Sequence, residues 1–346
     1  MFGRILEGIS SGIAMPLSFN IVIYTVPRAK IGTWLGVSSL VVSLAPSFGP
    51  TYGGFILDLL NWRAIFLILL IAPALSLLTG WTTIRNINNQ SKTNGFDFIA
   101  FALLTVILML SLMLVNQLAS NGFNWIYFTV LVITIVAFVW HSQQSKRSLL
   151  NLNLFKKGQF LVLFTPVALY MFSMLGLDLI IPTVAENALH TSSFIAGFSL
   201  LPGALTGALL NPYFGRMYDA HGGKLPMYLG NAIFMTAVVG MAVFTNQLGL
   251  WTLIISYVIY IIGRNMAYFG AQTAAIDDQV QSDQADATAI IQTFQMFMGS
   301  MGTTVGALMQ SQFGVLTGFK IFSFLSIGLS IINGILMWGY YQSKKR

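Results

Sequence analysis

The chain has 346 residues, of which 56% are hydrophobic and only 8% are charged. A soluble globular protein carries roughly 25% charged residues, so this composition excludes a water-soluble fold and predicts an all-α polytopic membrane protein. The net charge of +7 does not indicate a nucleic-acid partner, because the basic residues lie in short connections between apolar segments. The absence of cysteine excludes disulfides and thiolate metal sites.

Eleven apolar runs approach the roughly 20 residues that a helix needs to cross the bilayer. They are centred in residues 1–25, 34–57, 64–84, 98–115, 124–142, 159–182, 193–213, 225–245, 250–272, 288–312 and 319–340. No connection between them is long enough to hold a separate folded domain. We therefore expect eleven transmembrane helices.

Lysine and arginine set the expected orientation, because cytoplasmic connections carry an excess of them. Thirteen of the 17 basic residues follow odd-numbered runs or lie at the C-terminus, whereas only Arg63 and Lys320 occupy connections of the other parity. The odd-numbered connections and the C-terminus are therefore expected to be cytoplasmic. This orientation leaves Met1 outside although it already lies in an apolar run, so we expect the chain to be truncated at its N-terminus.

Two charged residues, Arg4 and Glu7, lie within the first run. They are three residues apart and so share one face of a helix. A charge at mid-bilayer costs about 2.5–3.5 kcal/mol, so each needs a reason to be there. Two interpretations stay open: the residues form a pair that protonation of Glu7 would switch, or both side chains extend to the membrane surface.

The second run contains the stretch Ala45-Pro46-Ser47-Phe48-Gly49-Pro50-Thr51-Tyr52-Gly53-Gly54. In a soluble helix proline costs about 3 kcal/mol and glycine about 1 kcal/mol relative to alanine, but neighbouring transmembrane helices can satisfy the freed backbone groups. Gly49 and Gly53 have the small-xxx-small spacing that allows a second helix to approach closely. We therefore expect a tight helix contact at Gly49, Pro50 and Gly53.

The later runs hold two more charged candidates. Asp178 lies near the end of the sixth run, four residues before Pro182, where either a solvated carboxylate near the outer surface or a gating and proton-carrying group is expected. Arg264 lies inside the ninth run and either extends to the inner surface or pairs with a carboxylate in a cavity. The three histidines fall at run ends or in connections, which does not favour a metal site.

One face of the tenth run is polar. It carries Gln292, Gln295 and Met296, and Gly299 continues it. Such a face either packs against another helix through its small residues or lines a substrate path. Methionine suits an adaptable apolar cavity, although it suits lipid-facing helices equally.

The motifs of the first three runs resemble those of major facilitator drug/proton antiporters. The second run is similar to the pattern G-x-x-x-G-P-x-x-G-G of their fifth helix, with Ala45 in place of the first glycine. Residues 3–8 resemble the R-x-x-Q-G motif of their fourth helix, with Glu7 where glutamine is usual. Residues 61–66 resemble the W-R-x-x-F sequence that opens their sixth helix.

A further stretch, residues 215–224, resembles the second copy of the family's loop motif G-x-x-x-D-R-x-G-R-K. The stretch contains Gly215, Arg216, Asp219, Gly222, Gly223 and Lys224. Ala220 replaces the arginine of the motif, so part of its charge pairing is lost. The resemblance implies that this loop links two helices at the cytoplasmic gate.

The resemblance implies a major facilitator fold in which the eleven helices correspond to helices four to fourteen of a 14-helix antiporter. Residues 1–90 would be the remainder of the N-terminal bundle, residues 91–156 a linker helix pair, and residues 157–346 a six-helix C-terminal bundle. It also implies that Arg4 lines the central cavity and takes part in proton coupling.

The function implied is proton-coupled export of drugs or other amphipathic compounds by alternating access. The chain has no G-x-x-x-x-G-K-[ST], H-E-x-x-H or G-x-S-x-G motif, so we expect neither an enzyme nor a nucleotide-driven pump, no cofactor, and a proton gradient as the energy source. Expected partners are a small amphipathic substrate and the lipid bilayer, with a monomer in the cell membrane. An exporter of one endogenous metabolite and a truncated, non-transporting remnant or scaffold are the alternatives.

Overall fold

The computed structural model describes residues 2–27, 30–83, 96–120, 122–145, 149–281 and 283–344. Within these residues the secondary structure is entirely helical, as the composition predicts. The helices are α1 (Phe2–Thr25), α2 (Ile31–Leu59), α3 (Trp62–Leu69), α4 (Ile71–Thr83), α5 (Phe98–Ser120), α6 (Trp125–Gln144), η2 (Leu152–Lys156), α7 (Gly158–Asn187), α8 (Ser193–Phe198), α9 (Leu201–His221), α10 (Lys224–Val243), η3 (Thr245–Gln247), α11 (Leu250–Asp277), α12 (Gln284–Phe313) and α13 (Val315–Ser343).

Ten segments of the described chain are long and apolar enough to cross a membrane, and they coincide with ten of the eleven predicted runs. The remaining run, the tenth, forms α12, which has 30 residues and at about 1.5 Å per residue is long enough to span. It is less apolar because it carries Gln292, Gln295 and several small residues, all of which are buried against other helices. The chain is thus a multi-pass membrane protein.

Two predicted runs are interrupted where a proline removes a backbone hydrogen bond. The run at 64–84 divides into α3 and α4 around Leu70, and the run at 193–213 divides into α8 and α9 around residues 199–200. Pro73 and Pro202 follow these breaks. Proline has no N–H for the carbonyl four residues earlier, and its ring clashes with that carbonyl. The helix therefore ends at Leu69 in one case and at Phe198 in the other.

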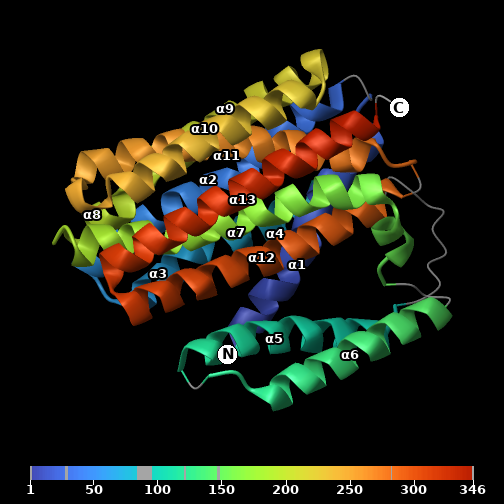
Figure 1. Ribbon diagram of the computed structural model, residues 1–346, viewed down its shortest axis with the longest axis horizontal. Helices are drawn as coiled ribbons and strands as arrows, with labels where there is room; N and C mark the ends of the chain where they lie inside the picture. Colours follow the sequence, from blue (N-terminus) through green and yellow to red (C-terminus); the bar gives the residue numbers. More distant parts are fainter. Residues whose placement is uncertain are drawn as a thin grey trace.

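Most of the core lies among α7 and α9–α13 (Figure 1). Helix α12 packs against α7, and α10 packs between α11 and α13. Large aromatic side chains fill the space between these helices, including the fully buried Tyr170, Phe234 and Tyr260. Helix α2 lies against α8 and α9, whereas the α5–α6 pair lies at the side of the molecule and contacts α12.

Glycines set the close approach of α2 to α8 and α9, but they are not the ones that spacing indicated. Among the described residues, a Cβ added at Gly49 or Gly53 would meet nothing within 4 Å. A Cβ at Gly54 would lie 2.8 Å from the Ser193 carbonyl oxygen, and one at Gly36 would lie 2.6 Å from the Asn211 carbonyl oxygen. The prediction of a tight contact at Gly49 and Gly53 is therefore wrong. Helix α2 is oriented so that Gly36 faces α9 and Gly54 faces α8 instead.

Pro50, the third member of the predicted contact, does lie at the helix interface. A Cβ added at Gly197 of α8 would lie 2.5 Å from the Pro50 carbonyl oxygen. The side chain of Ala45 lies outside the part of the chain that the structure describes.

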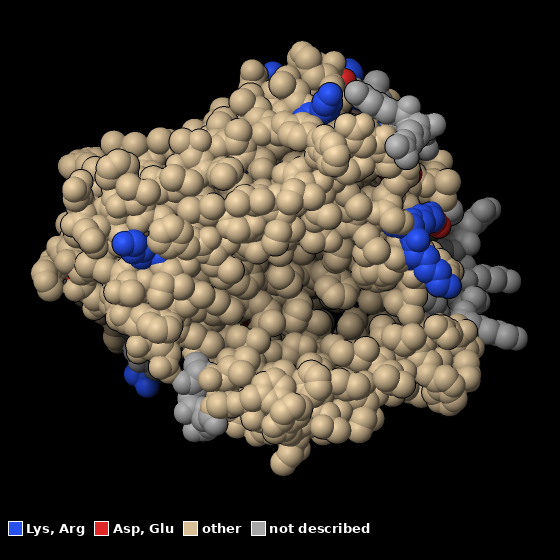
Figure 2. Space-filling view, viewed as in Figure 1, with Lys and Arg blue, Asp and Glu red and all other residues tan. Residues whose placement is uncertain are grey.

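Charged side chains lie near the two ends of the helices. On the face shown in Figure 2 the broad middle is formed by uncharged residues. We call the end where α1 stops and α2 begins the basic end; it also holds Lys157, Lys224 and Lys344. Two of these lysines form ion pairs with the acidic connection between α11 and α12: Lys157 Nζ lies 2.9 Å from Asp283, and Lys344 Nζ lies 3.0 Å from Asp278.

The α5–α6 pair is joined at the basic end by Asp97. Its carboxylate accepts hydrogen bonds from the Ala100 N–H at 3.0 Å and the Ser145 hydroxyl at 2.7 Å, and it lies 3.0 Å from His141 Nε2. These donors favour the charged form and lower the pKa of Asp97 to about 2, from an ordinary value of 3.8.

We expect this connection to loosen in acid. Because the pKa of Asp97 is lowered by folding, its stabilising contribution is present above about pH 4 and is lost as the pH falls toward about 2. Spin labels at Phe96→Cys and Gln144→Cys should show a broader distance distribution at about pH 2 than at about pH 5. Asp97→Asn should show the broad distribution at both pH values. Identical distributions in the unsubstituted protein would refute this role.

Candidate functional site

A cavity of about 480 Å³ lies between α1 and α2 on one side and α7, α9, α11 and α12 on the other. Sites for drug-sized molecules have volumes of roughly 300–1,000 Å³, so the cavity can hold a small organic compound. Much of its lining is apolar and adaptable, with Phe19 from α1, Met171 and Met174 from α7, and Met296 from α12. Methionine has a flexible side chain that can adjust to ligands of different shape.

The carboxylate of the cavity is Asp178 on α7. It accepts a hydrogen bond of 2.6 Å from the Tyr257 hydroxyl of α11, and both residues line the cavity. Asp178 thus lines the cavity, and α7, which has 30 residues, continues nine residues beyond it. Its gating or proton-carrying role stays a prediction.

Arg264 on α11 also lines the cavity and is only 4% exposed. Its guanidinium donates to the Tyr170 carbonyl oxygen at 3.4 Å, to Asn265 Oδ1 at 2.8 Å and to Met171 Sδ at 2.8 Å. The ring of Tyr268 lies 4.3 Å from the guanidinium carbon, close enough for a cation–π interaction. The side chain therefore does not extend to the membrane surface.

Gln292, Gln295 and Met296 line the opposite wall, as the polar face of their run suggested. The Tyr268 hydroxyl donates to Gln295 Oε1, and Gln295 Nε2 donates to Gln292 Oε1. This chain of hydrogen bonds connects α11 to α12 beside the cavity.

A second chain of hydrogen bonds leads from Arg264 to α2. Asn265 Oδ1 accepts from Arg264, Asn265 Nδ2 donates to Asn211 Oδ1 at 3.3 Å, and Asn211 Nδ2 donates to Ser43 Oγ at 3.4 Å. Ser43, Asn211 and Asn265 all line the cavity. This chain of hydrogen bonds therefore connects Arg264 to the contact between α9 and α2.

Of the two charged side chains of α1, the structure describes that of Glu7. Glu7 is exposed and is not among the residues that line the cavity. The side chain of Arg4 lies outside the part of the chain that the structure describes. The structure thus does not place Glu7 at the site that holds Asp178 and Arg264.

The loop motif holds α2 and α9 together at the basic end. Helix α2 has no side-chain cap of its own at Lys30; instead, Asp219 of α9 accepts from the N–H groups of Gly32 and Thr33 at 2.9 Å each and from the Thr33 hydroxyl at 2.6 Å. A carboxylate at a helix N-terminus is stabilised by the unpaired N–H groups and the helix dipole. We call this contact the Asp219 latch.

The other members of the motif shape the turn after α9. Gly215 lies where the backbone of α2 crosses at Gly32. Gly222 ends α9 with φ of 69°, a backbone conformation that favours glycine. Arg216 is exposed.

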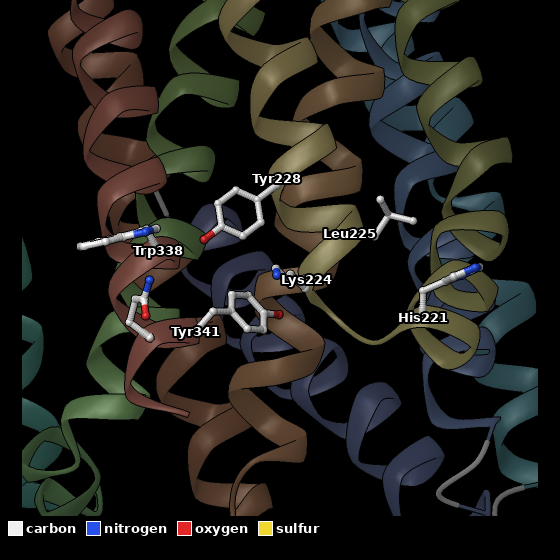
Figure 3. A pocket seen from close by; sticks show the side chains of 7 residues that line it. His221, Lys224, Leu225, Tyr228, Trp338 and Tyr341 are labelled. Atoms are coloured by element: carbon white, nitrogen blue, oxygen red, sulfur yellow. The ribbon is translucent and has the colours of Figure 1, made fainter. Parts of the chain in front are cut away.

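Gly223 and Lys224 begin α10 beside a second hollow of about 700 Å³, which is seen in Figure 3 between α10 and α13. Tyr228, Trp338 and Tyr341 surround it with Lys224, a combination typical of a membrane interface. None of its lining residues has a buried polar side-chain atom without a partner. The cavity between α2, α7, α11 and α12 is therefore the better candidate for a substrate site.

Sequence reasoning missed several polar residues of the cavity. Tyr268 and Gln272 follow the predicted Arg264 at intervals of four on α11, and this spacing places them on the same helix face as Arg264. Asn211 is an amide within an apolar run, and such residues face a protein interior rather than lipid. Both signals were present in the sequence. In contrast, no pattern indicated that Tyr257 would reach Asp178.

The chain resembles known transport proteins along most of its length. It is 30% identical over 325 residues to the lincomycin resistance protein LmrB of Listeria monocytogenes, covering 90% of this chain and 67% of the relative. It is 28% identical to the protein of the same name from Bacillus subtilis, with 87% and 64% covered. It is 26% identical to the multidrug export protein EmrB of Escherichia coli, with 62% and 43% covered.

The chain thus spans about two thirds of the length of the first two of these relatives. The family model for the Major Facilitator Superfamily matches residues 1–303. Together with the helical fold and the cavity at its centre, this match shows that the chain is a membrane transporter, not an enzyme, and belongs to the major facilitator superfamily.

Proposed function

We propose that this protein exports drugs or other amphipathic compounds in exchange for protons, by alternating access to the cavity described above. One observation carries the proposal: Asp178, Arg264, Gln292 and Gln295 lie together in a methionine-lined cavity between α1, α2, α7, α9, α11 and α12. The names of the relatives LmrB and EmrB support drug export. In transporters of this kind, two helical bundles move around a central site.

Proton coupling requires a group that changes charge inside the membrane. Asp178 has the required chemistry: as a carboxylate it accepts the hydrogen bond from Tyr257, and a proton on it would remove both the charge and that acceptor role. Arg4 and Glu7 remain predicted partners in coupling, on the strength of the family resemblance alone.

We expect Asp178→Asn to uncouple transport. The amide keeps the shape and the acceptor oxygen but cannot carry a proton, so proton-driven export should fall at least about tenfold while exchange of substrate across the membrane is retained. The matched control is Glu186→Gln, because Glu186 is an exposed carboxylate at the end of the same helix. Proteoliposomes containing a pH-sensitive dye measure both activities with lincomycin as substrate. Proton movement that survives Asp178→Asn would exclude this residue from coupling.

The orientation is proposed from the charge distribution. We propose that the basic end is cytoplasmic, that the C-terminus lies there, and that the protein acts as a monomer. The division into residues 1–90, 91–156 and 157–346, and the correspondence with helices four to fourteen of a 14-helix antiporter, also remain predictions. A membrane-impermeant thiol reagent tests the orientation, since Ser343→Cys in this cysteine-free chain should be unlabelled on intact cells and labelled after permeabilisation.

A further inference from the structure

Arg264 is a buried cation whose hydrogen-bond acceptors are all neutral. Within the part of the chain that the structure describes, no carboxylate oxygen lies within 4.0 Å of its guanidinium, and its three acceptors are a carbonyl, an amide oxygen and a thioether. Sulfur is a weak acceptor. A guanidinium stays protonated in proteins, and the carboxylate of Asp178 acts on this charge only through space.

Two amides of the same cavity add donors that have no acceptor. The Gln292 side-chain oxygen accepts a hydrogen bond from Gln295. The Gln292 amide nitrogen has no acceptor among the described residues. Gln272 approaches the Tyr268 hydroxyl, yet its amide nitrogen makes no hydrogen bond of good geometry. Gln292 and Gln272 are 4% and 3% exposed, and a buried donor without an acceptor is costly. Both residues line the cavity.

We call Arg264, Gln272 and Gln292 the donor pole of the cavity. Asp178 acts on Arg264 through space, and its carboxylate is hydrogen-bonded to Tyr257, which lies seven residues before Arg264 on α11. Gln272 lies eight residues after Arg264, so the donors extend along α11 away from Tyr257. The cavity is thus polarised along α11, with its acidic group toward Tyr257 and its donors toward Gln272.

We propose that the donor pole binds the carboxylate of an amphipathic substrate, whose apolar part lies against Phe19, Met174 and Met296. This inference rests on the proposed function and adds amphipathic carboxylates to the compounds that the same cavity would accept. A carboxylate brings a negative charge into hydrogen-bonding distance of Arg264 and has two oxygens with enough lone pairs to accept from Arg264 and Gln292 together.

A matched pair of ligands tests the proposal by binding alone. Tritiated naproxen and its primary amide have the same apolar body and differ in charge; their binding to the purified chain, captured on scintillation beads in detergent, gives two dissociation constants. We expect naproxen to bind at least about tenfold more tightly than the amide, because charge-assisted hydrogen bonds are roughly twice as strong as neutral ones.

Substitutions then show which residues bind the carboxylate of naproxen. Arg264→Gln should bind the two ligands equally, and Gln292→Leu should weaken naproxen binding severalfold. Arg63→Gln is the matched control, since Arg63 is an exposed arginine of α3 that does not line the cavity, and should leave the preference unchanged. If Arg264→Gln does not elute as a single species, Arg264→Lys replaces it; this variant keeps the charge but loses the planar fork, so the preference should shrink without vanishing.

Three results would overturn the proposal: equal affinities of the two ligands for the unsubstituted protein, no binding of either ligand, or a preference for naproxen that survives both Arg264→Gln and Gln292→Leu. Failure of the proposed function has a different signature. Absence of proton-driven lincomycin export with an intact preference for naproxen would leave the donor pole in place and refute only the export mechanism.

Discussion

Replacing Gly36 with leucine is expected to force α2 and α9 apart and to destabilise the protein by about 3 kcal/mol. A Cβ at this position would lie 2.6 Å from the Asn211 carbonyl oxygen and 2.9 Å from Pro212 Cα. Both atoms belong to the backbone, so no side-chain rotation can relieve the clash. The hydrogen bond between Asn211 and Ser43 lies in the same contact and would be lost as the helices separate.

The control for Gly36→Leu is Gly49→Leu on the same helix, where a Cβ would meet nothing within 4 Å among the described residues. Thermal unfolding of the detergent-solubilised protein, followed by fluorescence-detected size exclusion, compares the two. Gly36→Leu should lose its monodisperse peak at a temperature several degrees lower, whereas Gly49→Leu should match the unsubstituted protein. Equal unfolding temperatures for the two variants would show that the α2–α9 contact is less close than described.

Removing the Asp219 latch is expected to open the basic end. Asp219→Ala leaves the N–H groups of Gly32 and Thr33 without their acceptor, and the loss of an N-cap costs about 1–2 kcal/mol. A change of this size shifts an equilibrium between closed and open forms by about 5–30-fold. Because α2 has no side-chain cap of its own, nothing else in its first turn replaces the carboxylate.

Distances between spin labels measure the opening. Labels at Lys30→Cys and His221→Cys lie on exposed positions beside the latch, and Asp219→Ala should add a longer distance to their distribution. Asp219→Asn keeps one acceptor oxygen and should give an intermediate result. An unchanged distribution in Asp219→Ala would show that the latch does not hold the two helices together.

The membrane-spanning segments could be predicted from the sequence because each helix that crosses the bilayer needs its own run of about 20 apolar residues. Apolar length is enough to place α5, α10 or α13, and proline explains the breaks before Pro73 and Pro202. Which glycine faces a neighbour was not predictable in the same way. Gly49, Gly53 and Gly54 lie within six residues of one another, and helix rotation alone decides that Gly54 makes the contact.

The site was predictable where a polar residue interrupts an apolar run. Asp178, Arg264 and Gln292 stood out for this reason, and all line the cavity. Their partners were not predictable, because Tyr257 reaches Asp178 across 79 residues of chain and Asp219 reaches Thr33 across 186. Such contacts depend on how the helices pack, which local spacing does not specify.

If the cavity is the path of the substrate, filling it with a large side chain should abolish transport. Ala204→Trp would place an indole among the lining residues of α9, whereas Leu209→Trp on the same helix replaces a side chain that is 65% exposed and does not line the cavity. The measurement is proton-driven accumulation of tritiated lincomycin in everted membrane vesicles from cells that express the chain. We predict accumulation that an uncoupler abolishes, that Leu209→Trp retains and that Ala204→Trp removes. Undiminished accumulation in Ala204→Trp would contradict this role of the cavity.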